Sequence, residues 1–207
     1  MKEKINYLDI FRAAWKGLKS QFWLLTGLLI GFIIIYSLLF IFAIPAKGVS
    51  FGISSIIICI LSSFLLCLFQ LGYLKNCFQT LDGEEPQFSS YGQMSRKLIS
   101  YIAASLLFMV ITSIGFVLLV IPGIYLLLRL QFFFASMVDE NTGIIGSLKR
   151  SWEITKGQSI RLFVVMLIMI LISFAGQIAL FVGIFVAVPL IILMYGVAFR
   201  RLTTPMA

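Results

Sequence analysis

Few side chains in this sequence could do chemistry, and none of them forms a catalytic or metal-binding set. The 207 residues include no histidine, which removes the most common general base and the most common transition-metal ligand. Cys59, Cys67 and Cys77 lack the Cys-x-x-Cys spacing of zinc and redox sites and fall in or at the end of an apolar segment. No nucleophile has a base to activate it, so we expect no enzyme and no catalytic, cofactor or metal site.

An acidic cluster is the nearest approach to a metal site. Asp82, Glu84 and Glu85 could bind a divalent cation through their carboxylates. The same stretch, Asp-Gly followed by Glu-Glu-Pro, is also ordinary turn chemistry. We favour the turn and keep the cation as the alternative.

Arg129 is the one charged residue inside a predicted membrane span, where a charge is costly and therefore a candidate for function. It follows Pro122-Gly123 by six residues, roughly 9 Å along a helix, near enough to the outer surface to snorkel. Snorkelling, bonding to carbonyl groups and binding of a substrate anion all remain open for it. Three glutamines could line a polar path or simply pack between helices: Gln70, Gln131 and Gln177.

The elements that must hold these residues are membrane spans. Hydrophobic residues make up 61% of the chain, charged residues make up 12%, and the mean hydropathy is +1.08. A span needs about 20 apolar residues, and the stretches that qualify are 22–44, 51–73, 101–121, 124–138, 162–181 and 184–199. We predict an all-α integral membrane protein, one polytopic domain over residues 1–207, with its six transmembrane helices paired as three hairpins. Turns are expected at Pro45-Ala46-Lys47-Gly48, at Pro122-Gly123 and near Gly183.

Lysine and arginine lie almost entirely on one side of this arrangement. The chain has 16 Lys and Arg against 8 Asp and Glu. Fourteen of the basic residues share the side of the N-terminus, Lys47 falls on the other side, and Arg129 lies within a span. The positive-inside rule then predicts a multi-pass cell-membrane protein with both termini cytoplasmic. All carboxylates are expected on that side too, which leaves none in a span for proton coupling. The net charge of +8 indicates attraction to anionic lipid headgroups rather than to nucleic acid.

Amphipathic stretches precede the spans that leave the cytoplasm, and we expect them to form interfacial helices. The apolar faces of the first two are Leu8, Phe11, Trp15 and Leu18, and Phe88, Tyr91, Met94 and Leu98. The third has Ile144, Ile145, Leu148 and Trp152 on one face and Lys149, Arg150, Glu153 and Lys156 on the other. Asn141 or Thr142 is expected to cap this helix, and Gly157 to end it. The predicted headgroup contacts are Lys149, Arg150, Lys156, Trp15 and Lys19. Packing of the same face against the protein's own helices is the alternative.

Two weaker patterns concern repetition and packing. Trp15, Lys19 and Gln21 match Trp152, Lys156 and Gln158 at one constant offset, which would relate the first and third hairpins as a parallel repeat. The pairs Gly27 and Gly31, and Gly183 and Ala187, have the spacing of close-packed membrane helices. Packing within the chain and homo-oligomerisation explain that spacing equally well.

Part of the sequence resembles a known signature. It comprises Ile121-Pro122-Gly123-Ile124-Tyr125, Arg129, Val138-Asp139-Glu140 and Ser151-Trp152-Glu153-Ile154-Thr155-Lys156-Gly157. These residues resemble the bacterial six-span membrane domain fused to some glycerophosphodiester phosphodiesterases and its stand-alone relatives, including the YciC-like inner-membrane proteins. In fused members the soluble domain performs the hydrolysis, and this sequence has no counterpart to it. The resemblance makes its most distinctive residues candidates for a functional or structural role: Arg129, Pro122, Gly123, Asp139, Glu140, Trp152, Lys156 and Gly157.

The sequence therefore favours a non-enzymatic protein of the bacterial inner membrane, an accessory or scaffold protein linked to envelope lipids or to export. A small permease or a transporter of lipids or small molecules is the alternative. Transport would require Arg129 and the three glutamines to face one cavity, whereas a scaffold would pack them separately.

Overall fold

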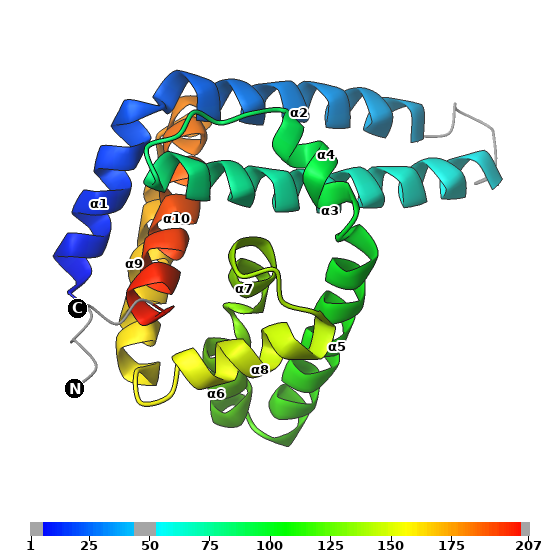
Figure 1. Cartoon of the computed structure of the whole chain (residues 1–207). Helices are drawn as coiled ribbons and strands as arrows, with labels where there is room; N and C mark the ends of the chain where they lie inside the picture. The colour runs from blue at the N-terminus through cyan, green and yellow to red at the C-terminus, as the bar shows by residue number, and fades with distance from the viewer. Residues whose placement is uncertain (1–5, 44–52, 204–207) are drawn as a thin grey trace.

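The computed structural model describes residues 6–43 and 53–203, and the regular structure in these ranges is entirely helical. Its ten helices are α1 (Tyr7–Ser20), α2 (Phe22–Ala43), α3 (Ile53–Leu81), α4 (Ser89–Ser95), α5 (Leu98–Leu118), α6 (Val120–Leu130), α7 (Phe133–Asp139), α8 (Ile144–Ile154), α9 (Ser159–Ile178) and α10 (Leu180–Thr203). Figure 1 shows α2 and α3 running side by side and α9 paired with α10.

Six segments within the described ranges are long and apolar enough to cross a membrane, which confirms the predicted fold class. They are Phe22–Leu39, Ile56–Leu81, Leu98–Leu118, Val120–Asp139, Ser159–Ile178 and Gly183–Thr203. The helix of the second span, α3, continues well beyond residue 73, and Asn76 and Thr80 in its last turns are buried. The predicted turn at Pro45-Ala46-Lys47-Gly48 lies outside the described residues.

Two of the spans form the centre of the molecule. Half of the residues in Val120–Asp139 and in Gly183–Thr203 are buried, against 17–22% in the other four. α10 contacts α1, α2, α3 and α9, and its residues Leu193, Met194, Ala198 and Phe199 are almost fully buried. Pro189 lacks an N–H, and the carbonyl of Phe185, four residues earlier, instead accepts a hydrogen bond from Thr26 Oγ1 at 3.5 Å. The spans around this centre have few buried residues, as contact with lipid would require.

The fourth span differs from its prediction in two places. The turn lies at Leu119, whose backbone is extended (φ −166°, ψ 154°), and not at Pro122-Gly123. Pro122 instead stands in the first turn of α6, where an N–H has no helical partner and proline is tolerated. The span is also broken, since α6 ends at Leu130 and α7 begins at Phe133.

Close helix crossings occur where glycine faces glycine. A Cβ on Gly183 would lie 2.2 Å from the carbonyl oxygen of Gly176, at the contact between α9 and α10. A Cβ on Gly123 would lie 2.5 Å from the ring of Phe116, at the crossing of α5 and α6. Gly27 and Gly31 have nothing within 4 Å of an added Cβ, although their spacing suggested packing as strongly. The small residues of α9 and α10 therefore serve packing within the chain.

In α1 and α8 only part of the predicted apolar face packs against the protein, through Leu18 and Leu148, and the rest is exposed or partly exposed. In α1 the buried residues are Ile10, Ala14 and Leu18, whereas Leu8, Phe11 and Trp15 are exposed. In α8 the buried residues include Ser147, Leu148 and Ser151, with Thr155 just beyond the helix, whereas Ile145 and Trp152 are exposed. The buried series 10, 14, 18 and 147, 151, 155 stand at the same offset as Trp15 and Trp152, so the burial pattern repeats along with the sequence pattern.

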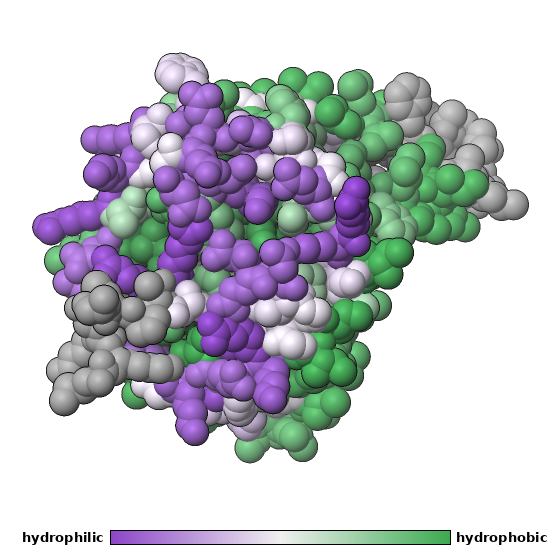
Figure 2. Space-filling model, in the orientation of Figure 1, coloured by the Kyte–Doolittle hydropathy of each residue, from purple (hydrophilic) through white to green (hydrophobic). Residues whose placement is uncertain are grey.

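Hydrophilic residues gather on one side of the molecule. Figure 2 shows them over α1, α8 and the C-terminal part of α10, whereas α5 and the far ends of α2 and α3 present hydrophobic residues. The polar side is therefore built from the short helices and the ends of the spans.

Candidate functional site

The candidate residues of the signature meet where the fourth span breaks. The carbonyl of Arg129, at the end of α6, accepts a hydrogen bond from Ser151 Oγ at 2.9 Å and lies 3.1 Å from Thr155 Oγ1, whose one proton it shares with the Ser151 carbonyl at 2.7 Å. The N–H of Phe132, in the turn before α7, donates to Ser151 Oγ at 3.0 Å. One hydroxyl of α8 thus bonds a carbonyl in the last turn of α6 and the N–H of the residue that precedes α7.

α10 supports the same break from another direction. The Tyr195 hydroxyl donates to the Gln131 carbonyl at 2.8 Å and accepts from the N–H of Ala135 at 3.3 Å. Buried backbone groups without partners are costly, and these contacts provide partners for groups on both sides of the gap. Specific hydrogen bonds from side chains of α8 and α10 therefore stabilise the break.

The Arg129 side chain is enclosed beside this break. It is only 3% exposed, and its guanidinium carbon lies 4.1 Å from the ring centroid of Trp152 and 5.8 Å from that of Tyr125. The two rings meet edge to face, with centroids 6.0 Å apart. Arg129 therefore does not snorkel to the outer surface, because its carbonyl is bonded to the end of α8 and its side chain is covered by aromatic rings.

No anion balances this charge within the described residues. The Nε atom of Arg129 is buried without a hydrogen-bond partner, and the ion pairs of the described ranges involve only Arg150 and Arg200. Removing an ion from water costs several kcal/mol in real proteins, whereas a desolvated cation–π contact stabilises by about 2 kcal/mol. The aromatic contacts thus offset only part of the cost of burying Arg129.

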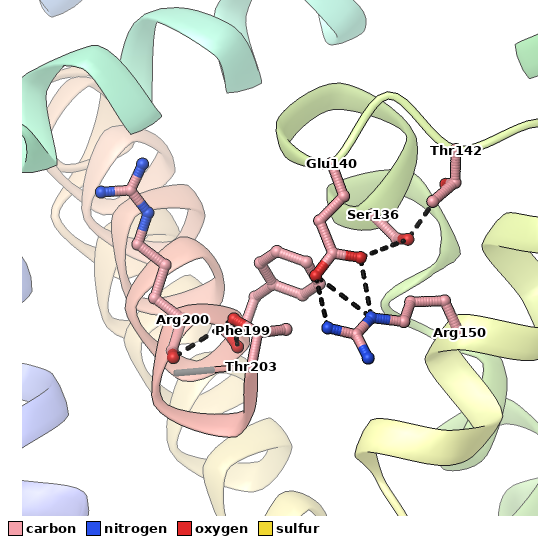
Figure 3. A network of polar contacts seen from close by, with 7 residues as sticks. All are labelled: Ser136, Glu140, Thr142, Arg150, Phe199, Arg200 and Thr203. Atoms are coloured by element: carbon pink, nitrogen blue, oxygen red, sulfur yellow. Dashed lines mark hydrogen bonds and ion pairs between the residues drawn. The ribbon is translucent and has the colours of Figure 1, made fainter. Parts of the chain in front are cut away.

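Glu140 and Arg150 form the principal ion pair on the polar side, shown in Figure 3. Arg150 donates from Nη2 to Oε1 at 2.7 Å and from Nε to Oε2 at 2.8 Å, a two-point contact. Ser136 Oγ donates to the same carboxylate at 3.3 Å and lies 3.0 Å from Thr142 Oγ1. These hydrogen bonds to Glu140 raise the pKa of Arg150. The ion pair connects α8 to the end of α7. Arg150, which was predicted to contact headgroups, therefore has a partner within the protein.

Asp139 and Asp82 share Arg200, at the end of α10. Arg200 Nη2 lies 2.8 Å from Asp82 Oδ2 and 3.3 Å from Asp139 Oδ1, and its Nη1 bonds Asp82 Oδ1. The hydrogen bonds from Arg200 lower the pKa of Asp82. Gly83 follows in the left-handed region (φ 81°), so the acidic stretch forms a turn that is held by an arginine.

The remaining predicted residues lie at the surface or at turns. Lys149 and Lys156 are exposed, as are Ile145 and Trp152, and Lys19 stands over the Trp15 ring at 5.5 Å. Gly157 has φ 80° in the turn after α8, as a helix stop requires. Neither Asn141 nor Thr142 caps α8, whose N-cap is Gly143. Asn141 instead takes a left-handed φ of 56° and accepts a hydrogen bond from Lys97.

Sequence reasoning missed the residues that hold the break. Ser151 and Thr155 stand four residues apart, and Ser147 precedes them at the same spacing, so a stripe of hydroxyls was visible in the sequence. Tyr195 carried no such signal, because it lies in an apolar run some sixty residues away from its partners.

Comparisons with known proteins give relatives but no activity. Residues 88–207 match the family described as Domain of unknown function (DUF7847). An uncharacterized protein of Mycobacterium tuberculosis, Rv2560, is 29% identical over 163 residues, which cover 77% of this chain and 47% of the relative. An uncharacterized protein of Mycobacterium bovis, Mb2590, matches to the same extent. The chain thus spans about half the length of the curated relatives it matches, and no solved structure matches it.

Proposed function

The chain belongs to this family of domains of unknown function, and we propose that it is a non-enzymatic accessory or scaffold protein of the bacterial inner membrane. Its partners would be anionic lipids of the cytoplasmic leaflet and a membrane protein of the envelope or of an export system. The alternative is a small permease or a transporter of lipids or small molecules.

The separation of the polar groups within the spans is the observation that carries the proposal. Gln70 accepts a hydrogen bond from Tyr101 at 2.8 Å, Gln131 bonds the carbonyl of Leu128, and Gln177 bonds Ser173. The Arg129 side chain makes none of these hydrogen bonds and lies against Trp152. Each group is bound to its own neighbour, as expected of a scaffold, and the polar contacts of the described residues do not form the continuous series that a transport path requires.

The polar side supports an interfacial role. α1 and α8 each expose a tryptophan beside basic residues: Trp15 with Lys19, and Trp152 with Lys149 and Lys156. Tryptophan is favoured at headgroup depth, and each basic residue near an anionic surface contributes about 1 kcal/mol. With this side on the cytoplasmic leaflet, both termini are cytoplasmic, in agreement with the positive-inside count.

The resemblance of Ile121–Gly157 to the glycerophosphodiester phosphodiesterase membrane domains gives the proposal its link to envelope lipids. Among these residues, Ser151 and Thr155 hold the break of the fourth span, and Glu140 binds Arg150 of α8. These hydrogen bonds stabilise the fold, and a scaffold protein would share such contacts with a fused membrane domain. Relationship to that family remains part of the proposal.

A flux measurement separates the scaffold from the permease. The purified chain in proteoliposomes should leave the transbilayer movement of fluorescent phospholipids, and the efflux of trapped small anions, at the rates of protein-free vesicles. Saturable flux above that background, lost in Gln70→Leu but kept in the matched surface variant Gln93→Leu, would establish the permease and overturn the scaffold.

Orientation is tested separately by labelling single cysteines. In a chain without Cys59, Cys67 and Cys77, Lys47→Cys should react with an impermeant thiol reagent added outside intact cells, and Lys149→Cys should not. Equal labelling of both positions would contradict the proposed six-span orientation.

A further inference from the structure

Arg129 has the properties expected of a residue that binds a ligand, because no described residue forms an ion pair with its side chain. Arginine is charged in proteins, and Arg129 is only 3% exposed, yet its Nε has no hydrogen-bond partner. The aromatic rings of Trp152 and Tyr125 lie against it. A ring attracts the cation but offers no lone pair, so these contacts leave the buried Nε–H of Arg129 without an acceptor.

The carboxylates of the described residues do not supply that acceptor. Glu140 is bound by Arg150, and Asp82 and Asp139 are bound by Arg200. Of the other described carboxylates, Glu84, Glu85 and Glu153 are exposed and Asp9 is partly buried, and none of the four forms an ion pair with Arg129.

The surroundings of Arg129 add hydrogen-bond donors and an approach from the surface. Tyr125 and Trp152 are 43% and 39% exposed, so the cluster reaches the surface at these rings. The Tyr125 hydroxyl and the Trp152 indole N–H have no partner among the described residues and remain available as donors. Arginine binds phosphate oxygens through a planar fork of N–H groups, and tyrosine and tryptophan combine an apolar ring with one polar tip.

We propose that Arg129, Tyr125 and Trp152 form a binding site for the anionic phosphate group of a phosphate ester. In this site the Arg129 guanidinium binds the phosphate anion, and the rings of Tyr125 and Trp152 border the guanidinium. Ser151 and Thr155 hold the backbone of Arg129 in place. The phosphate can come from an anionic lipid headgroup or from a soluble glycerol phosphate, which present the same chemistry. The site goes beyond the proposed scaffold, because a phosphate can bind there whether or not the chain has a protein partner.

Trp152 itself reports on occupancy. In a chain carrying Trp15→Phe and Trp23→Phe, Trp152 is the only remaining tryptophan, and its emission should change when an anion draws the guanidinium from its ring. The detergent-solubilised full chain is titrated with short-chain phosphatidylglycerol, with diacylglycerol of the same chains, and with glycerol 3-phosphate. The first should give a saturable change and the second should not.

Variants then assign the effect to Arg129. We expect Arg129→Gln to weaken binding at least about tenfold, and the exposed control Arg96→Gln to change it less than about twofold, as loss of a charged hydrogen bond implies. Arg129→Lys, which keeps the charge without the fork, should fall between them. Thermal melting and size-exclusion chromatography establish that each variant is folded.

The outcomes decide both the site and the source of the phosphate. Binding of phosphatidylglycerol without glycerol 3-phosphate identifies a lipid headgroup, and binding of both identifies a general phosphate-ester site. Should Arg129→Gln fail to fold, the wild-type comparison of phosphatidylglycerol with diacylglycerol still tests the site. Equal responses to those two lipids, no response to any phosphate, or unchanged affinity in folded Arg129→Gln would overturn it.

Discussion

Ser151→Ala offers the most direct test of how the break in the fourth span is held. The Ser151 residue is fully buried, and its hydroxyl donates to the Arg129 carbonyl and accepts from the Phe132 N–H. Alanine leaves the N–H without a partner, which costs roughly 1–3 kcal/mol for a buried group. The carbonyl is less affected, because Thr155 Oγ1 remains 3.1 Å from it. We therefore expect a loss of about 2 kcal/mol in the free energy of unfolding.

The double variant Ser151→Ala/Thr155→Val sharpens this prediction. Once both hydroxyls are gone, the Arg129 carbonyl loses both of its side-chain donors, so the two substitutions together should cost more than the sum of the single effects. Reversible unfolding in mixed micelles of mild detergent and dodecyl sulfate measures these differences. Ser89→Ala is the control, because that exposed hydroxyl bonds only the Gln87 side chain. A Ser151→Ala chain as stable as this control, or strictly additive effects, would refute the assigned role of the hydroxyls.

The other predictions concern packing and pH. Gly183→Ala should destabilise the chain by about 1–3 kcal/mol in the same unfolding assay, because its Cβ would lie 2.2 Å from the backbone oxygen of Gly176. Gly27→Ala should be neutral or stabilising by up to about 1 kcal/mol, because nothing lies within 4 Å of the added Cβ. Similar losses for both would contradict the observed crossing. Arg200 lowers the pKa of Asp82 in the folded chain, so the stability that this pair contributes is present above the unfolded pKa of about 3.9 and is lost as the pH falls through the folded value. Because the Asp82 side chain is 48% exposed, Asp82→Asn should cost less than about 1 kcal/mol near pH 7, and a cost that persists below the folded pKa would exclude the ion pair as its cause.

Hydropathy predicted the spans because the cost of exposing polar groups to lipid depends only on local composition. It did not predict the break between α6 and α7, since Leu130, Gln131 and Phe132 include no helix breaker. That break depends on hydroxyls from Ser151 and Tyr195, which only the tertiary structure brings together. The Pro-Gly pair was the stronger local signal, and it misled because proline fits the first turn of a helix as well as a loop.

The candidate residues were found more easily than their roles. Arg129 was identified because a charge in an apolar run is conspicuous, but its depth was inferred from distance along one helix. Its actual neighbours are Trp152, on α8, and Tyr125, one turn earlier. The faces of α1 and α8 show the same limit: apolar spacing identifies two amphipathic helices, but it does not decide which apolar side chains face protein and which face lipid.

The matching burial of α1 and α8 has a consequence for how the chain could have evolved. Ile10, Ala14 and Leu18 belong to a helix packed against α10, which forms one continuous helix, and alkyl groups there need only fill space. Ser151 and Thr155 stand at the positions of Ala14 and Leu18 but face a span with interrupted backbone hydrogen bonds. If both segments descend from one ancestor, the exchange of alkyl for hydroxyl side chains had to accompany the interruption, because a broken span facing alkyl groups leaves buried N–H and C=O groups unpaired. The interruption and the hydroxyls would then have arisen together, and a homologue with an interrupted span but no hydroxyls would be less stable.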